Sequence, residues 1–181
     1  MLFRSMFTKW NTSKVKNRAN LKTSLVSKLK ANAVKYIPRF GEIEDEIFPK
    51  KKPVIVHNLG DHCSMYSIDG HPLLVELGDG TIFPFLKIAI EYPCLVKSVY
   101  CYDEAMIALL RGAKLMARGT WGADATFRKG DVVQICLMGT KIPFAIGLME
   151  MDGEEIALRH DGAAVNVLHM LKDGLWEAKK I

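Results

Sequence analysis

The sequence predicts an α+β protein made of two closely packed parts. Its 181 residues are 49% hydrophobic and 25% charged, so the chain has enough apolar material for a buried core. Apolar side chains recur at helical spacing in residues 21–48, and short apolar runs separated by Gly-containing turns follow up to residue 77. A further helix and a β-hairpin are predicted between residues 99 and 151. This mixture of helices and short strands indicates an α+β fold.

The first helix is expected to begin at Asn20, whose side chain can accept a hydrogen bond from a free amide of the first turn. Its predicted apolar stripe recurs near helical spacing: Leu21, Leu25, Leu29, Ala33 and Tyr36. Pro38 lacks a backbone N–H and should end or kink this helix. A second short helix is predicted over residues 41–48 and is closed by Pro49.

Short strands are predicted to follow: residues 54–56, 63–68 and 73–77. Between the last two, Asp69-Gly70 indicates a tight hairpin turn, because both residue types tolerate a positive φ. Residues 83–91 should form a helix that accommodates Pro84 in its first turn. Tyr92-Pro93 marks the boundary to the second part of the chain.

The second part is expected to open with a short helix that begins with Asp103 as its cap and ends at Gly112. The apolar face of this helix has side chains at i, i+3 and i+4: Met106, Leu109 and Leu110. A short strand over residues 114–117 and a turn at Gly119 should follow. The chain then continues with two apolar runs that are predicted to pair as a buried hairpin: residues 132–138 and 144–151.

The net charge of +5 is unevenly distributed along the sequence. Up to Lys52 there are 13 basic and 4 acidic residues, whereas the remainder has 12 basic and 16 acidic residues. The first part therefore carries +9 and the rest −4. This segregation favours binding of a polyanion, such as nucleic acid, through the basic part. The alternative is a solvated helix whose lysines only keep the protein soluble.

Membrane insertion and secretion are disfavoured. No apolar run reaches the roughly 20 residues that span a bilayer, and no secretory signal peptide of the usual form is present. The acid-free start leaves a mitochondrial presequence open as an alternative. The cysteines lack paired metal-type spacing, so we expect reduced, mostly buried thiols and a cytoplasmic location.

Catalytic and metal-binding motifs are not found. His57, His62, Cys63 and His71 crowd one region, but their spacing does not match a zinc finger. The adjacent His62 and Cys63 would point to opposite faces of a strand. There is no P-loop and no dinucleotide-binding fingerprint. We therefore expect no metal, no cofactor, no small-molecule substrate and no enzymatic activity.

The order of elements from residue 99 to residue 151 resembles the PUA domain, an RNA-binding module. The resemblance rests on three stretches: Arg111-Gly-Ala-Lys-Leu-Met-Ala-Arg-Gly119, Lys129-Gly-Asp-Val-Val133 and Ala145-Ile-Gly147. Glu104 stands where the signature usually has Gly, and Arg118 replaces the Pro before Gly119. The resemblance implies a PUA β-barrel. These two departures affect the expected RNA contacts at that turn. They hardly affect the expected fold.

The rest of the chain resembles the malignant-T-cell-amplified-sequence family. The shared motifs lie in the front half and at the end of the chain: Leu21-Lys-Thr-Ser24, Ile37-Pro38, Ile47-Phe-Pro-Lys-Lys51, Asp69-Gly70, Phe83-Pro84, Glu91-Tyr-Pro93 and Val167-Leu-His-Met-Leu-Lys-Asp-Gly-Leu-Trp176. The resemblance starts at Met6. It implies an extension over residues 1–5, an N-terminal pre-PUA domain over residues 6–93 and a PUA domain over residues 94–181.

This resemblance implies an RNA-binding translation factor that acts on the small (40S) ribosomal subunit. Members of the family promote release of deacylated tRNA and mRNA after termination and support reinitiation or non-standard initiation. They work as a heterodimer with the density-regulated protein, so the implied partners are that protein and small-subunit rRNA, with tRNA as a further candidate. Two alternatives stay open: a protein–protein adaptor, and an accessory protein of RNA modification, since PUA domains also occur on RNA-modifying enzymes.

The candidate RNA-binding residues fall into two groups. The first lies in the basic front part: Lys28, Lys30, Lys35, Lys50, Lys51 and Lys52. The second surrounds the predicted Gly-Ala turn: Arg111, Gly112, Ala113, Lys114 and Arg118. Phe83, Met149 and Met151 are candidates for an exposed apolar surface that a protein partner would cover, with burial in the core as the alternative.

Overall fold

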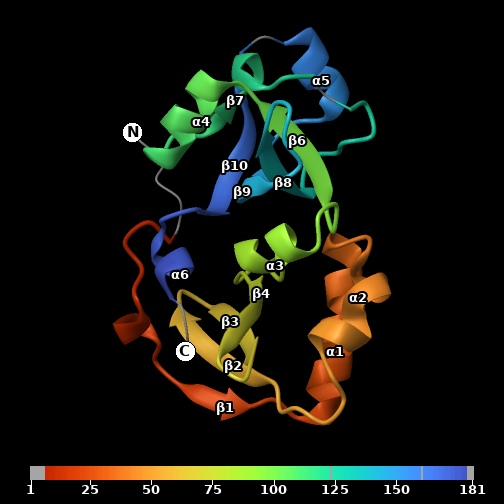
Figure 1. Ribbon diagram of the computed structural model, residues 1–181, viewed down its shortest axis with the longest axis vertical. Coiled ribbons are helices and arrows are strands. Elements are labelled where there is room, and N and C mark those ends of the chain that lie inside the picture. The colour runs from red at the N-terminus through yellow and green to blue at the C-terminus, as the bar shows by residue number, and fades with distance from the viewer. Residues whose placement is uncertain (1–6, 123, 160, 179–181) are drawn as a thin grey trace.

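Two five-stranded sheets lie one above the other along the long axis of the molecule (Figure 1). The computed structural model describes residues 7–122, 124–159 and 161–178. The predicted extension over residues 1–5 lies outside this range. Among the described residues, no helix is long and apolar enough to span a bilayer.

The first sheet is an antiparallel meander in chain order. Its strands are β1 (Arg18–Asn20), β2 (Ile55–Gly60), β3 (Cys63–Ile68), β4 (His71–Glu76) and β5 (Ile82–Pro84). The predicted Asp69-Gly70 turn joins β3 to β4, with φ angles of 52° and 78°. Helices α1 (Thr23–Tyr36) and α2 (Phe40–Ile47) are inserted between β1 and β2 and lie beside this sheet (Figure 1).

The start of the first helix differs from the prediction. Asn20 does not cap α1; it is the last residue of β1 and pairs with Ile55 of β2. Backbone pairing with a distant strand therefore outweighs the local capping preference. Leu25 is 46% exposed, so it does not belong to the buried stripe, which passes through Leu29 and Ala33.

The helix predicted over residues 83–91 is shorter than expected. Phe83 and Pro84 belong to β5, where Phe83 pairs with Val75 of β4. Helix α3 (Leu86–Glu91) begins only after Phe85, whose backbone is extended. The prediction that Pro84 sits in the first turn of a helix is therefore wrong.

The second sheet curls into a barrel-like shape. Its order is β6-β8-β9-β10-β7, from β6 (Lys97–Cys101), β7 (Leu115–Met116), β8 (Val132–Leu137), β9 (Pro143–Met149) and β10 (Ala163–Met170). The predicted β8–β9 hairpin is present. A single bridge between Thr120 and Cys101 brings the chain after β7 back to β6, which closes the curl.

The helices around this sheet are short: α4 (Asp103–Leu110), the 3-10 helix η2 (Ala117–Gly119), α5 (Gly153–Leu158) and α6 (Gly174–Glu177). Asp103 is the first residue of α4 and not its cap; Tyr102 is at the cap position and makes no side-chain capping bond. The apolar face of α4 is narrower than predicted, because Leu109 is buried while Leu110 is exposed. The predicted helix end at Gly112 is confirmed by its φ of 94°.

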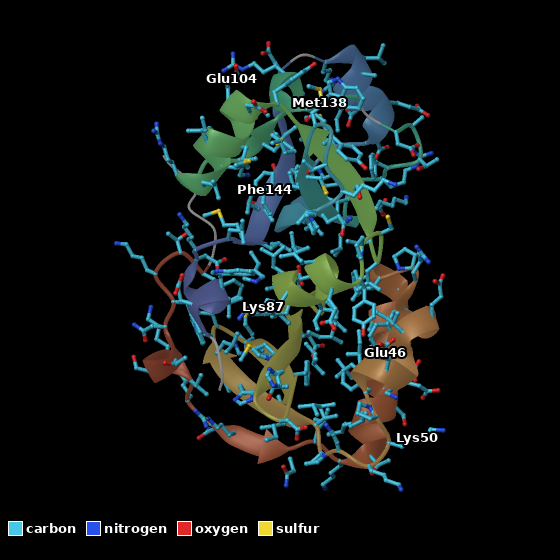
Figure 2. All side chains as sticks on the ribbon, in the orientation of Figure 1. Glu46, Lys50, Lys87, Glu104, Met138 and Phe144 are labelled. Atoms are coloured by element: carbon cyan, nitrogen blue, oxygen red, sulfur yellow. The ribbon has the colours of Figure 1, made fainter. Side chains whose placement is uncertain are left out.

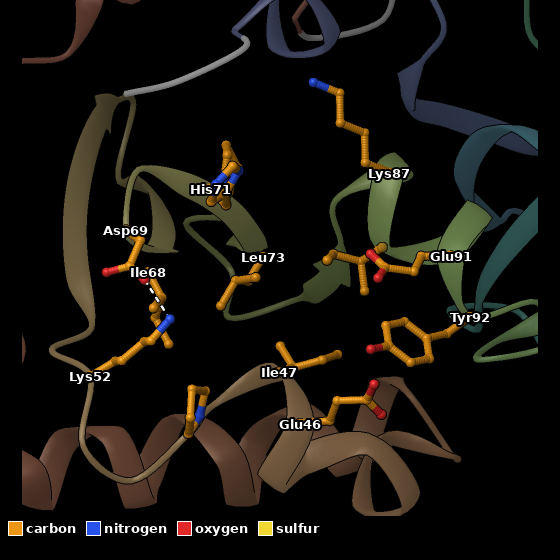
Figure 3. A pocket seen from close by; sticks show the side chains of 13 residues that line it. Glu46, Ile47, Lys52, Ile68, Asp69, His71, Leu73, Lys87, Glu91 and Tyr92 are labelled. Atoms are coloured by element: carbon orange, nitrogen blue, oxygen red, sulfur yellow. Dashed lines mark hydrogen bonds and ion pairs between the residues drawn. The ribbon is translucent and has the colours of Figure 1, made fainter.

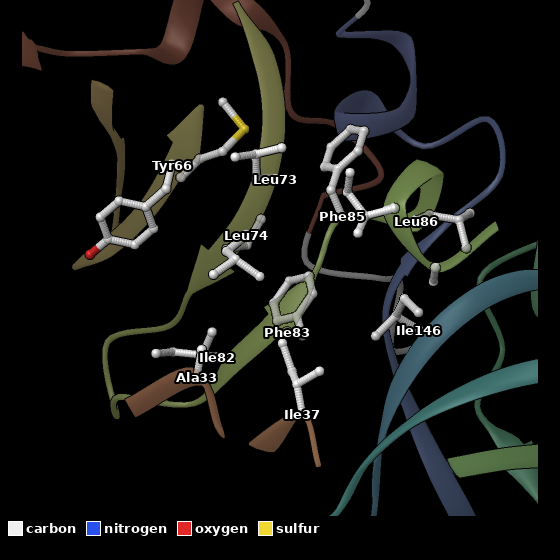
Figure 4. Packing of buried hydrophobic residues seen from close by; sticks show 14 of the residues in the cluster. Ala33, Ile37, Tyr66, Leu73, Leu74, Ile82, Phe83, Phe85, Leu86 and Ile146 are labelled. Carbon is white, nitrogen blue, oxygen red and sulfur yellow. The ribbon is translucent and has the colours of Figure 1, made fainter. Parts of the chain in front are cut away.

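The buried side chains form two clusters: one fills the interior of the second sheet, and the other fills the first half and reaches β8, β9 and β10, so the two parts are closely packed as predicted. Helix α3 lies between them (Figure 1), and its Leu86 lies in the same cluster of buried side chains as Ile146 of β9 (Figure 4). The segment after β10 is hydrogen-bonded to the first described residues, because the Gly174 amide donates to the Phe7 carbonyl at 2.9 Å. The cluster that contains Leu86 and Ile146 therefore packs the two halves against each other.

The proposed exposed apolar surface is not found. Phe83, Met149 and Met151 are all buried in the core. They fill space between elements that are far apart in sequence, so the alternative of core burial is correct for all three.

Candidate RNA interface

The turn after α4 has the hydrogen bonds of a glycine-terminated helix. The Gly112 amide donates to the Leu109 carbonyl at 2.8 Å, and the Ala113 amide donates to the Ala108 carbonyl at 3.1 Å. Gly112 is buried and Ala113 is half-buried. These two predicted contact residues therefore shape the turn, while their charged neighbours supply the exposed surface.

Three cations surround this turn. Arg111, at the end of α4, and Arg118, in η2, are exposed. Lys114 is half-buried, and its Nζ lies 2.7 Å from Oε1 of Glu150. Arg111 and Arg118 therefore offer their charge to solvent, whereas much of the charge of Lys114 is already compensated. We call Arg111, Lys114 and Arg118 the PUA surface.

In the front half, a groove of about 570 Å³ brings four of the six predicted lysines together. It lies between the start of α1 and the loop after α2, and no acidic side chain lines it. Its lysines are Lys30, Lys50, Lys51 and Lys52. Apolar side chains such as Val26 and Val54 line the same groove, so it combines an apolar wall with positive charge.

Two of these groove lysines are engaged within the protein. Lys30 Nζ lies 3.1 Å from Glu44 and 5.5 Å from the centre of the Phe48 ring. Lys52 Nζ lies 2.6 Å from Asp69 Oδ2, the pair marked in Figure 3. Among the described residues, Lys50 and Lys51 have no ion-pair partner, and both are exposed.

Lys28 and Lys35 form a separate exposed pair on α1. They are seven residues apart, so they lie on the same side of the helix. Lys35 also lines a smaller cleft of about 260 Å³ together with Lys97 and Lys129 of the second half. The sequence alone did not single out these two lysines, because only the folded chain brings them beside α1. We call Lys28, Lys35, Lys50 and Lys51 the front surface.

The two groups of candidates do not form one site. Figure 2 shows Lys50 at the lower end of the long axis and Glu104, in the first turn of α4, near the upper end. The predicted residues are therefore divided between the two halves of the molecule, with Lys35 of the front surface beside the second half.

A second pocket, which shares Pro49 and Lys52 with the groove of about 570 Å³, does not resemble an RNA site. It has a volume of about 330 Å³ and carries both acidic and basic side chains, among them Glu46, Glu91 and Lys87 (Figure 3). Burial and the carboxylate of Glu46 raise the pKa of Tyr92 to about 12, so its hydroxyl stays protonated. The mixed charges of this pocket do not complement a polyanion.

The histidines and cysteines considered for a metal site are dispersed. His57 is buried with Nε2 2.7 Å from Ser67 Oγ, and burial, together with the charge of Arg18, lowers its pKa. His62 lies in the turn between β2 and β3 with a φ of 58°, not on a strand as predicted. Within the described part of the chain, no group of three or more His, Cys, Asp or Glu side chains is placed to hold a metal ion.

The cysteines of the described ranges are thiols that form no disulfide there, and Cys63, Cys101 and Cys136 are buried. Burial raises the pKa of both Cys101 and Cys136 to about 11. A thiol acts as a nucleophile only as the thiolate, so these two are poor nucleophiles at neutral pH.

Each half of the chain matches a known domain family. Residues 10–93 match the Pre-PUA-like domain, and residues 97–171 match the PUA domain. Translation machinery-associated protein 20 of Saccharomyces cerevisiae is 32% identical over 177 residues, which cover 94% of this chain and 97% of that protein. Malignant T-cell-amplified sequence 2 of Homo sapiens is 28% identical over 178 residues, covering 96% of this chain and 98% of that protein. The chain belongs to the malignant-T-cell-amplified-sequence family.

Solved structures agree with the fold described for this family member. A hypothetical protein of Pyrococcus horikoshii superposes with a TM-score of 0.74 at 25% identity and covers 89% of this chain and 98% of its own. A PUA domain protein of Aeropyrum pernix gives a TM-score of 0.73 at 28% identity, with 91% of each chain covered.

This member of the malignant-T-cell-amplified-sequence family also exposes aromatic residues that were not predicted from the sequence. Tyr102 and Trp121 are 41% and 47% exposed, and they lie at the edge of the PUA barrel. The sequence contained one signal for this aromatic surface. Tyr100 and Tyr102 are two residues apart, so in a strand both side chains point to the face opposite Cys101.

Proposed function

We propose that this chain is a translation factor that binds the RNA of the small ribosomal subunit. An RNA-binding role related to translation follows from its family and its PUA domain. The observation that carries the finer proposal is the similarity to Translation machinery-associated protein 20 over nearly the whole of both chains. A relative that shared the PUA domain alone would support RNA binding only.

The charge distribution supports a docking mechanism. Exposed lysines and arginines release counterions from RNA when they approach its phosphates, which favours binding at low salt. The front surface and the PUA surface belong to different halves of the chain, which pack against each other through one shared cluster of buried side chains. Two linked contacts bind more tightly than either alone when one RNA reaches both.

We further propose that the chain acts in the cytoplasm without catalysis, together with a homologue of the density-regulated protein. The complex would promote release of deacylated tRNA and mRNA from the 40S subunit after termination and assist reinitiation or non-standard initiation. Direct contact with tRNA is part of this proposal. Phe83, Met149 and Met151 do not bind the partner, because they are buried.

The function is tested with 40S particles that carry labelled deacylated tRNA. The chain, its partner and the co-purified complex are added separately, and the tRNA that remains bound is measured by filter retention. We expect a stable one-to-one complex on size exclusion, and release by the complex only. Full release by the isolated chain would contradict the proposal, and so would failure to bind the partner at micromolar concentration.

A further inference from the structure

The closure of the PUA barrel gathers aromatic side chains on its outer surface. Cys101 and Thr120 pair across the closing bridge, and both are buried. Successive residues in extended strands point to opposite faces, so their neighbours point outward. These neighbours make the hydrogen bonds of the bridge: the Trp121 amide donates to the Tyr100 carbonyl at 2.8 Å, and the Tyr102 amide donates to the Gly119 carbonyl at 3.2 Å.

The Tyr100 ring packs against Trp121 and leaves part of the indole uncovered. The Tyr100 and Trp121 rings are 6.3 Å apart between centroids and nearly perpendicular, with an interplanar angle of 89°. Whichever ring supplies the edge of this contact, at least one face of the indole is not covered by Tyr100. The residue Trp121 as a whole is 47% exposed, so part of its apolar surface is accessible to solvent.

Two further apolar side chains extend this surface. Tyr102 is 41% exposed and follows β6 directly. Met138 is also exposed, and its amide donates to the Cys101 carbonyl at 3.0 Å, which places it beside Tyr102. Exposed Tyr, Trp and Met side chains gathered in this way usually mark a binding site.

The surroundings favour RNA as the ligand. Gly119, which accepts the Tyr102 hydrogen bond, directly follows Arg118, so the aromatic surface is continuous with the PUA surface. Asp103 and Glu104 follow Tyr102 in the first turn of α4; both are exposed, and their carboxylates repel phosphate. A bound strand would therefore place its phosphates toward Arg118 and its bases over the rings.

We propose that Trp121, held by Tyr100 and extended by Tyr102, is a stacking platform for unpaired nucleobases. This inference rests on the proposed RNA-binding function and adds the class of RNA that this end of the protein takes: single-stranded segments, not regular duplex. Bases stack on aromatic rings regardless of sequence, because each base has a π face. The platform accordingly supplies affinity with little base preference.

The test compares Trp121→Ala and Trp121→Phe in the full chain, with Leu158→Ala as the control for loss of an exposed apolar side chain. The probe is a fluorescently labelled ten-nucleotide oligoadenylate, and a blunt RNA duplex is the second ligand. We expect Trp121→Ala to weaken oligoadenylate binding about tenfold. Trp121→Phe and Leu158→Ala should stay near wild type, and duplex binding should not change.

Salt dependence separates stacking from charge. Removing a stacking ring lowers log K equally at all salt concentrations, whereas removing a cation that neutralises a phosphate changes the slope of log K against log salt. We expect an unchanged slope for Trp121→Ala and a shallower slope for Arg118→Ala.

Wild-type affinity in Trp121→Ala, with weaker binding in Arg118→Ala, would overturn the platform and leave the RNA-binding function standing. Failure of Trp121→Ala to bind the protein partner, with intact RNA binding, would assign the surface to a protein instead. No RNA binding by the wild type would overturn both.

Discussion

Lys114 Nζ lies 2.7 Å from the Glu150 carboxylate, so this residue of the PUA surface also contributes an ion pair to the folded structure. Lys114→Ala should therefore lower the free energy of unfolding by about 0.5–1 kcal/mol, since the pair is partly exposed. Arg111→Ala should change it by less than about 0.5 kcal/mol. Both variants should bind RNA more weakly. Thermal melts and RNA titrations measure the two effects, and equal loss of stability would show that Arg111 is structural too.

The left-handed backbone at Gly112 predicts a graded series of substitutions. At a φ of 94°, a β-branched side chain is strongly strained, so Gly112→Val should destabilise the protein by about 1–3 kcal/mol. Asn tolerates positive φ better than other residues, so Gly112→Asn should cost less. Chemical denaturation gives both values. If the two variants are equally stable, the helix end does not depend on the glycine.

The exposed lysines of α1 should contribute charge without contributing stability. Lys28→Gln/Lys35→Gln should reduce the slope of log K against log salt by about 0.7–0.9 for each phosphate that is no longer neutralised, and it should melt like the wild type. Lys30→Gln is the matched control. It removes the ion pair with Glu44 and the interaction with the Phe48 ring, so it should lower the melting temperature instead. An unchanged slope in the double variant would leave these lysines as solubilising residues only.

Buried His57 should make the protein less stable in mild acid. Burial and Arg18 lower its pKa in the folded state below the unfolded value of about 6.5. As the pH falls through about 6.5, the unfolded chain takes up a proton that the folded chain does not, so the free energy of unfolding decreases. His57→Gln should flatten this dependence between about pH 5 and pH 7. The same pH dependence in both proteins would exclude His57 as its source.

Much of the fold could be predicted because its signals are local. The Asp69-Gly70 turn, the end of α4 at Gly112 and the β8–β9 hairpin each follow from a few adjacent residues. Two of the misplaced boundaries have the same physical cause. Asn20 pairs with Ile55 and Phe83 pairs with Val75, and these strand pairings compete with helical preferences. No local pattern reveals such pairing.

The candidate site could be predicted in residue type but not in detail. The basic run and the Gly-Ala turn identified the residues, yet Lys114 and Glu150 are 36 positions apart, and Lys52 and Asp69 are 17 positions apart. Which cations are free for RNA depends on these distant carboxylates. The aromatic platform was missed for the same reason, since Trp121 meets Tyr100 only when the barrel closes.

Binding to the small ribosomal subunit is the central claim, and sedimentation through a sucrose gradient tests it most directly. The tagged chain is mixed with purified 40S particles and run at several salt concentrations, beside a variant that changes Lys28, Lys35, Lys50, Lys51, Arg111 and Arg118 to Gln. We predict that the wild type comigrates with 40S particles at low salt and dissociates as salt rises, while the variant stays at the top. A wild-type chain that remains at the top of the gradient at every salt concentration would contradict the account.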